Sequence, residues 1–223
     1  MSDPTQLSGP VFGPVQAPAK QFIMFLHGVG ADGNDLIGLA PEFARILPNA
    51  AFASPNAPQA CDFAPMGRQW FSLMDRSPQA LLRGVQSAAP IVNAFLDAEL
   101  AKWNLDDSAL ALIGFSQGTM VALYTALRRP KPCAAVLAYS GALLGAETLA
   151  TEIVSRPPVL LVHGDQDPVV PVEALGHAAA VLTDNRVPVD MNVRKGLGHG
   201  IDAEGFLLGA KFLAQRFGVG GPA

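Results

Sequence analysis

Residues 109–118, Ala-Leu-Ala-Leu-Ile-Gly-Phe-Ser-Gln-Gly, pass from an apolar run into a serine set between two glycines. The apolar run predicts a buried strand, and the spacing of apolar residues over 119–129 predicts a helix after it. A Gly-x-Ser-x-Gly string on a strand-to-helix turn is typical of a nucleophile elbow, because only small neighbours fit so tight a turn. The serine hydroxyl then projects above the sheet edge, at the positive end of the helix. The pattern indicates Ser116 as a candidate nucleophile.

The five letters from Gly114 to Gly118 have a second interpretation. Glycine makes up 22 of the 223 residues, so composition alone produces such a string in some chains of this kind. In that case Ser116 would only cap a helix in a glycine-rich connection. The two interpretations differ in what else the chain must hold, because a nucleophilic serine needs a base, an acid and an oxyanion hole.

Composition bounds the class of protein. Half of the residues are hydrophobic and 15% are charged, which is enough apolar material for the core of one α/β domain. The net charge of −4 is spread along the chain, and no cluster of Lys and Arg points to a nucleic-acid partner. Cys61 and Cys133 are too few for a disulfide framework, so we expect two reduced thiols.

The N-terminal residues, Met-Ser-Asp-Pro, do not form a basic segment followed by an apolar core, so we expect no signal peptide. No apolar run approaches the roughly 18 residues that span a bilayer. We therefore expect a cytoplasmic protein without a transmembrane segment. The sequence leaves a homodimer open.

Short apolar runs alternate with longer amphipathic stretches along the chain, which predicts a mostly parallel sheet covered by helices on both faces. Residues 1–20, rich in proline, predict an irregular or edge-strand lead-in to a single doubly wound α/β domain at 21–218. The stretch between 139 and 159 is too short for a cap domain. Strands are expected at 22–26, 50–53, 109–115, 134–139, 159–162 and 189–193. Helices are expected at 36–47 with a break at Pro41, at 81–100 with a kink at Pro90, and at 119–129, 172–182 and 201–217.

Polar residues follow four of the expected strands, at the point where each strand ends. In open α/β sheets the loops at the carboxyl ends of the strands form the active site. Packing does not account for polar groups gathered at four such ends, so we expect them to belong to one site. They are the loop from His27 to Gly33, Ser116, the loop from His163 to Asp167, and the loop from Gly196 to Gly200.

The chemistry of acyl transfer requires a specific role from each of these groups. A neutral serine hydroxyl is a poor nucleophile, so an imidazole must remove its proton, and a buried carboxylate must hold that imidazole in the correct tautomer. His199 is the candidate base, because it lies between glycines in the last long loop; the alternative is a capping or surface histidine. We expect His163 to orient its own loop, His27 to brace the glycine-rich turn, and His177 to lie within a helix.

The acid is Asp165 or Asp167. Both follow the same strand, and spacing alone does not separate them. The order of serine, acid and histidine along the chain is that of α/β-hydrolases.

Several strings closely resemble the phospholipase/carboxylesterase and acyl-protein thioesterase family of α/β-hydrolases. They are Leu-His-Gly-Val-Gly at 26–30, Gly-Phe-Ser-Gln-Gly at 114–118, His-Gly-Asp-Gln-Asp-Pro-Val-Val-Pro at 163–171, Gly-His at 198–199, and Trp70-Phe71. The resemblance extends from about residue 21 to 212. It implies an α/β-hydrolase fold for residues 21–218. It also implies that Asp167, the aspartate before the proline, is the triad acid, and that Asp165 is a structural hydrogen-bonding residue.

Two backbone groups are expected to form the oxyanion hole. One is the N–H of the residue after the nucleophile, Gln117. The other should come from the glycine-rich turn after the first buried strand, and the family resemblance places it at Val29.

The substrate pocket is expected to be an open, apolar groove that suits esters or thioesters with flexible acyl chains. Trp70, Phe71, Leu73 and Val169 are its expected walls, although Trp70 fits equally well as a loop anchor packed on the core. No cofactor and no metal are expected, because the chain has no HExxH string, no Cys/His cluster and no GxGxxG after a strand.

We interpret the chain as a serine carboxylesterase that acts through an acyl-enzyme intermediate on a small-molecule ester or thioester. The alternative is another hydrolase of the same fold, such as an acyl-thioesterase, a lysophospholipase or a lactone hydrolase. A binding protein of this fold without catalysis is the third alternative. The complete set of triad and oxyanion strings argues against it.

Overall fold

Strands with apolar side chains on both faces form the centre of the protein, a computed structural model that describes residues 7–220. β2 (Gln21–Leu26) and β6 (Leu110–Phe115) are buried along almost their whole length. Because successive side chains on a strand point to opposite faces, Met24 packs into one core and Ile23 into another. Strands of this kind need a layer of helices on each side.

The main sheet has seven strands in the order β1-β3-β2-β6-β7-β8-β9. All neighbours are parallel except β1 and β3, so the predicted mostly parallel, doubly wound sheet is confirmed. β1 is a two-residue edge strand within the lead-in; residues 1–6 of that lead-in lie outside the described residues. Besides β2 and β6, the strands of this sheet are β1 (Val11–Phe12), β3 (Ala50–Ala53), β7 (Ala135–Tyr139), β8 (Val159–Gly164) and β9 (Val189–Arg194).

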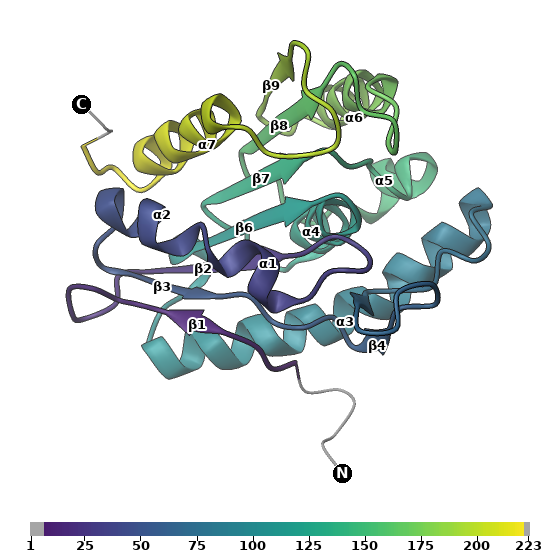
Figure 1. Ribbon diagram of the computed structural model, residues 1–223. Helices are drawn as coiled ribbons and strands as arrows, with labels where there is room; N and C mark the ends of the chain where they lie inside the picture. Colours follow the sequence, from purple (N-terminus) through teal and green to yellow (C-terminus); the bar gives the residue numbers. More distant parts are fainter. Residues whose placement is uncertain (1–6, 221–223) are drawn as a thin grey trace.

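Helices cover both faces of this sheet (Figure 1). One face carries α1 (Gly33–Ile37), α2 (Ala40–Ile46) and α7 (Ala203–Arg216). The other carries α3 (Pro78–Trp103), α4 (Gln117–Arg128), α5 (Ala146–Glu152) and α6 (Glu173–Asp184).

We expected a break at Pro41 and a kink at Pro90, and the two prolines differ in their positions within the helices. Pro41 stands in the first turn of α2, where the missing N–H has no intrahelical acceptor to lose, and the chain divides there into α1 and α2. Pro90 lies inside α3, which nevertheless continues as one helix of 26 residues. Among the described helices, none is both long and apolar enough to cross a bilayer.

Two elements were not expected from the sequence. The short helix α5 lies between β7 and β8. The long loop at 59–77 contains a small antiparallel ribbon of β4 (Gln59–Ala60) and β5 (Arg68–Gln69).

A buried arginine joins the end of α4 to α3 and to the turn before β6. The side chain of Arg129 is only 4% exposed. Its Nε donates to Asp107 at 2.6 Å, and its two terminal nitrogens donate to Asn93 at 2.7 Å and Asp97 at 2.8 Å. Three polar partners satisfy a charge that would otherwise be costly to bury.

We expect Arg129→Met to lower the free energy of unfolding by about 3 kcal/mol, because the largely buried Asp107 carboxylate loses its partner. Urea denaturation of the purified proteins measures this change. Arg45→Met is the control, since the Arg45–Glu42 pair is exposed on α2, and we expect a change within about 0.5 kcal/mol. Equal losses in the two variants would contradict the prediction.

Candidate active site

Ser116 stands at the junction of β6 and α4 in a strained backbone conformation. Its φ is 55° and its ψ is −117°, which residues other than glycine rarely adopt. Its side chain makes no capping hydrogen bond to α4. The interpretation of Ser116 as an ordinary helix cap is therefore wrong, and the surrounding structure holds this residue in a strained conformation at the end of β6.

The glycines on either side of Ser116 are required by close backbone approach. A Cβ at Gly118 would lie 1.9 Å from the carbonyl oxygen of Leu26, so α4 rests directly on the end of β2. A Cβ at Gly114 would lie 2.5 Å from the Cα of Thr119. Larger residues at these positions would push α4 away from the sheet.

The carboxylate of Asp167 is fully buried and receives three hydrogen bonds. Its Oδ1 accepts the backbone N–H groups of Val169 at 2.8 Å and Val170 at 2.9 Å. Its Oδ2 is bonded to Nδ1 of His199 at 2.7 Å. Nε2 of His163 lies 3.1 Å from the same oxygen, and its hydrogen-bond partner is the carbonyl of Val170 at 2.9 Å. The structure therefore brings together Asp167 and His199, two of the expected site residues, and adds His163.

The hydrogen bonds decide the charge of Asp167. Burial alone would raise the pKa of this carboxyl, but the hydrogen bonds from His199 and from the N–H groups of Val170 and Val169 outweigh it and hold the pKa below its usual value. Asp167 is therefore ionised. An ionised acceptor at Nδ1 places the proton of a neutral His199 on that nitrogen and leaves Nε2 free to accept.

The ring of His199 packs on Phe115, with ring centroids 4.8 Å apart. Its side chain is 17% exposed, so it is partly open to solvent. Phe115 directly precedes Ser116 in the chain. The loop from Gly196 to Gly200, here called the histidine loop, therefore lies beside Ser116.

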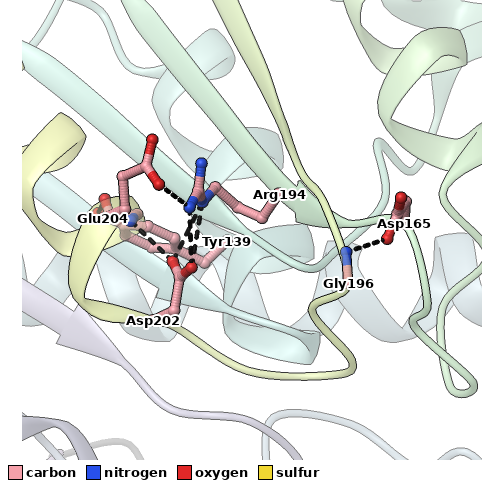
Figure 2. Close-up of polar contacts among 7 residues, drawn as sticks. Tyr139, Asp165, Arg194, Gly196, Asp202 and Glu204 are labelled. Atoms are coloured by element: carbon pink, nitrogen blue, oxygen red, sulfur yellow. Dashed lines mark hydrogen bonds and ion pairs between the residues drawn. The ribbon is translucent and has the colours of Figure 1, made fainter.

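Asp165 has a different position from Asp167. Its Oδ1 accepts the backbone N–H of Gly196 at 2.6 Å, at the start of the loop that carries His199 (Figure 2). Its own N–H donates to the carbonyl of Arg194 at 3.0 Å, and Gln166 N–H donates to the carbonyl of Leu197 at the same distance. The two loops after β8 and β9 are thus joined by backbone contacts as well as by the Asp167–His199 bond.

Arg194, the last residue of β9, holds the C-terminal end of the histidine loop. Its guanidinium binds both oxygens of Asp202, with a shortest distance of 3.0 Å, and also pairs with Glu204 (Figure 2). Asp202 also accepts the N–H of Gly205 and so caps α7. Tyr139 donates its hydroxyl to the carbonyl of Gly205 at 3.1 Å. Side chains therefore fix both stems of the loop around His199.

His27 is buried and both of its ring nitrogens are occupied. Nε2 accepts the N–H of Ala57 at 3.0 Å, so Nδ1 carries the proton and donates to the carbonyl of Gly28 at 2.8 Å. Burial lowers the pKa of this imidazole. His27 therefore stays neutral and braces the turn that follows β2.

The side chain of Gln117 has a role that sequence analysis missed. Its Oε1 accepts the N–H of Trp70 at 2.9 Å, and its Nε2 donates to the carbonyl of Phe71 at 2.8 Å. Its own backbone N–H belongs to the first turn of α4, where no intrahelical acceptor exists. No local sequence signal could reveal this tie, because the partners are 46 and 47 residues apart.

Our expectation that Trp70 and Phe71 line the substrate pocket is wrong. Trp70 is 1% exposed and Phe71 is 2% exposed, and both pack in the core. The indole Nε1–H of Trp70 donates to the carbonyl of His27 at 2.9 Å. Trp70 is a loop anchor, because its polar edge has a buried acceptor and its ring fills the core.

A groove of about 330 Å³ opens beside Ser116 and includes two of the expected walls, Leu73 and Val169. Both expected oxyanion residues, Val29 and Gln117, line it as well. Sequence analysis did not find the remaining walls, which are Phe63, Arg76, Leu81, Met120, Val170 and Pro171.

Possible metal ligands and thiols are other chemically active side chains in residues 7–220. No group of three His, Cys, Asp or Glu side chains within that range is close enough to hold a metal ion. Cys61 and Cys133 are free and buried. Burial raises the pKa of the Cys133 thiol to about 12, so it is no nucleophile.

Comparison with known proteins agrees with this geometry. The model of the phospholipase/carboxylesterase family matches residues 11–216. The crystal structure of esterase PE8 is 41% identical and superposes with a TM-score of 0.92, covering 95% of this chain and 99% of that one. Esterase YpfH of Escherichia coli K12 is 27% identical over 83% of this chain and 78% of its own length. Acyl-protein thioesterase 1 of Schizosaccharomyces pombe is 28% identical over 88% and 91%.

The different positions of the two aspartates predict different effects of the same substitution. We expect Asp167→Asn to lower kcat/KM for p-nitrophenyl butyrate by about 10⁴, because an amide favours the wrong imidazole tautomer. Asp165→Asn keeps an oxygen for the N–H of Gly196, so we expect a loss of less than about tenfold and a lower melting temperature. The opposite ranking in folded proteins, checked by circular dichroism, would show that Asp165 is the acid.

Proposed function

Because the chain belongs to the phospholipase/carboxylesterase family of α/β-hydrolases, we propose that Ser116, Asp167 and His199 are the catalytic triad of a serine carboxylesterase. The protein is a carboxylic-ester hydrolase, as its family and its esterase relatives indicate. The observation that carries the assignment of residues is the bond between His199 and the buried Asp167, at the same sheet edge as the strained Ser116.

In this mechanism Ser116 attacks the carbonyl carbon of the ester while Nε2 of His199 takes the hydroxyl proton. The negative charge that forms on the carbonyl oxygen is stabilised by the N–H groups of Val29 and Gln117. His199 then gives the proton to the departing alkoxide and leaves an acyl-enzyme. Water, activated by the same histidine, releases the acid and restores Ser116.

The contacts of Asp167 support its part in this cycle. When His199 gains a proton, the carboxylate at Nδ1 stabilises the imidazolium, and Asp167 remains ionised because its hydrogen bonds hold its pKa low. The oxyanion assignment is supported by the groove, which Val29, Ser116 and Gln117 line together.

The groove beside Ser116 suits an acyl chain of moderate length. Its volume of about 330 Å³ is at the lower end of the range usual for ligand pockets, and most of its walls are apolar. An acyl thioester is the second candidate substrate, because a relative that spans most of this chain is an acyl-protein thioesterase. We also propose a cytoplasmic location, which the two free cysteines support.

We expect Ser116→Ala to abolish hydrolysis of p-nitrophenyl esters from acetate to decanoate, of an acyl thioester and of a lysophospholipid, whichever of these the native protein accepts. The melting temperature should stay nearly unchanged, because the hydroxyl makes no capping bond. A fluorophosphonate should modify the native protein at Ser116, as peptide mass spectrometry can show. Turnover that survives in Ser116→Ala, or labelling at another serine, would refute the assignment.

The rate of hydrolysis should fall as the pH is lowered, because the proposed mechanism needs an imidazole that can accept the serine proton. The base accepts the serine proton only when it is neutral. Hydrogen bonds lower the pKa of Asp167 and burial lowers the pKa of His27, so each takes up a proton only at a lower pH than the free group does. A pH profile of kcat/KM measures this, and EDTA should leave the profile unchanged.

Two histidine variants complete the pH experiment. His199→Ala should remove nearly all turnover, whereas His177→Ala should have no effect, since His177 is exposed on α6. A normal rate in His199→Ala, or activity that EDTA removes and a divalent ion restores, would contradict the mechanism.

A further inference from the structure

A second hollow, of about 260 Å³, lies beside the histidine loop and shares no lining residue with the groove at Ser116. The two occupy opposite faces of the sheet. Leu73, Leu81 and Met120 of the groove pack against the core under α3 and α4. The hollow lies on the side of the core under α1, α2 and α7. It is lined by Asp35, Leu36, Leu39, Phe115, Gly200 and Ile201.

Two residues that line the hollow, Phe115 and Gly200, are the chain neighbours of Ser116 and His199. Phe115 precedes Ser116 in the chain, and its ring contacts the ring of His199. Gly200 follows His199. The proposed oxyanion donors, Val29 and Gln117, line the groove instead. The hollow is therefore on the histidine side of the nucleophile, and the groove is on the oxyanion side.

We propose that this hollow binds the alcohol part of the ester, while the groove binds the acyl part. The inference rests on the proposed function, in which the departing oxygen takes its proton from His199 and must therefore lie on the histidine side. The acyl carbonyl must lie at the oxyanion donors, which leads the acyl chain into the groove.

The residues that line the hollow determine which alcohol parts of an ester it favours. Leu36, Leu39, Phe115 and Ile201 are apolar, and Asp35 is the one charged residue among the lining groups. Asp35 is exposed and forms no ion pair with another side chain in residues 7–220. The preferred substrates are thus esters of apolar alcohols, neutral or carrying an ammonium group, rather than esters whose alcohol part carries a phosphate.

A longer alcohol part would meet a second carboxylate. Asp35 also lines a more open hollow of about 620 Å³, together with Asp32 and Asn34. Arg76, the one cationic residue among the groove walls, lies on the acyl side. The distribution of charge disfavours lysophospholipids, whose phosphate belongs to the departing part.

Three butyrate esters with the same acyl group test the proposal. They are butyrylcholine, its neutral isostere 3,3-dimethylbutyl butyrate, and 2-phosphoethyl butyrate. For Asp35→Asn we expect kcat/KM of the choline ester relative to the neutral ester to fall about two- to fivefold from its native value, the size expected for one exposed charge pair. The relative rate of the phosphate ester should rise by a similar factor. Comparison of each ratio between variant and native protein cancels the different intrinsic reactivities of the esters.

The salt dependence and a matched variant show whether the change in the two ratios comes from the charge of Asp35 or from a general change in the enzyme. Both ratios should approach those of Asp35→Asn when the native protein is measured at 1 M salt, because screening weakens exposed charges. Asp184→Asn removes a similar exposed carboxylate at the end of α6 and should leave both ratios at their native values.

Substitutions that change the size of a lining side chain test which part of the substrate occupies which cavity. Ile201→Trp should lower the rate with 3,3-dimethylbutyl butyrate much more than with methyl butyrate. Leu73→Ala should change the dependence on acyl-chain length and leave the alcohol ratios unchanged. Unchanged ratios in Asp35→Asn, or an equal effect of Ile201→Trp on both neutral esters, would overturn the proposal while Ser116-dependent hydrolysis continued. Absence of hydrolysis of every ester would instead refute the proposed function.

Discussion

The carboxylate of Asp167 is negatively charged and fully buried, and the surrounding backbone supplies donors that stabilise the charge. A buried carboxylate is costly unless donors satisfy it, and here two backbone N–H groups and the imidazole of His199 do so. Those donors come from the turn after β8 and from the loop after β9. The two segments must therefore converge before the charge can be buried, which ties the candidate site to the order of the strands in the sheet.

Close backbone contact makes that convergence possible. A Cβ at Gly164 would lie 2.2 Å from the carbonyl oxygen of Leu197, so the end of β8 supports the histidine loop without an intervening side chain. Gly118 plays the same part where α4 meets β2. Hydrogen bonds at Asp165 and Asp202 fix the two stems of the histidine loop. His199 is consequently held by backbone contacts and by side chains at the loop stems, although it lies in no helix or strand.

The sequence predicted the sheet, the elbow and the loops that carry polar groups, because each of these has a local pattern. It could not separate Asp165 from Asp167 by spacing, since both follow one strand, and only the family resemblance chose between them. In the structure the difference is one of direction: Asp167 points to His199, and Asp165 to the backbone of Gly196. Trp70 was misplaced because an aromatic residue in a loop has the same pattern whether it faces a pocket or the core. The ties made by Gln117 were missed because their partners are distant in sequence.

Gln117 links two parts of the protein that would otherwise vary separately. Its backbone begins α4 beside Ser116, and its side chain holds the loop at Trp70 and Phe71, which a second bond attaches to the carbonyl of His27. The segment from 72 to 76, with Leu73 and Arg76 on the groove, therefore extends from a fixed point. Changes of length or composition in that segment can reshape the groove while the elbow stays in place. If the groove holds the acyl chain as proposed, this short stretch is a place where acyl preference can change while Ser116 and His199 keep their positions.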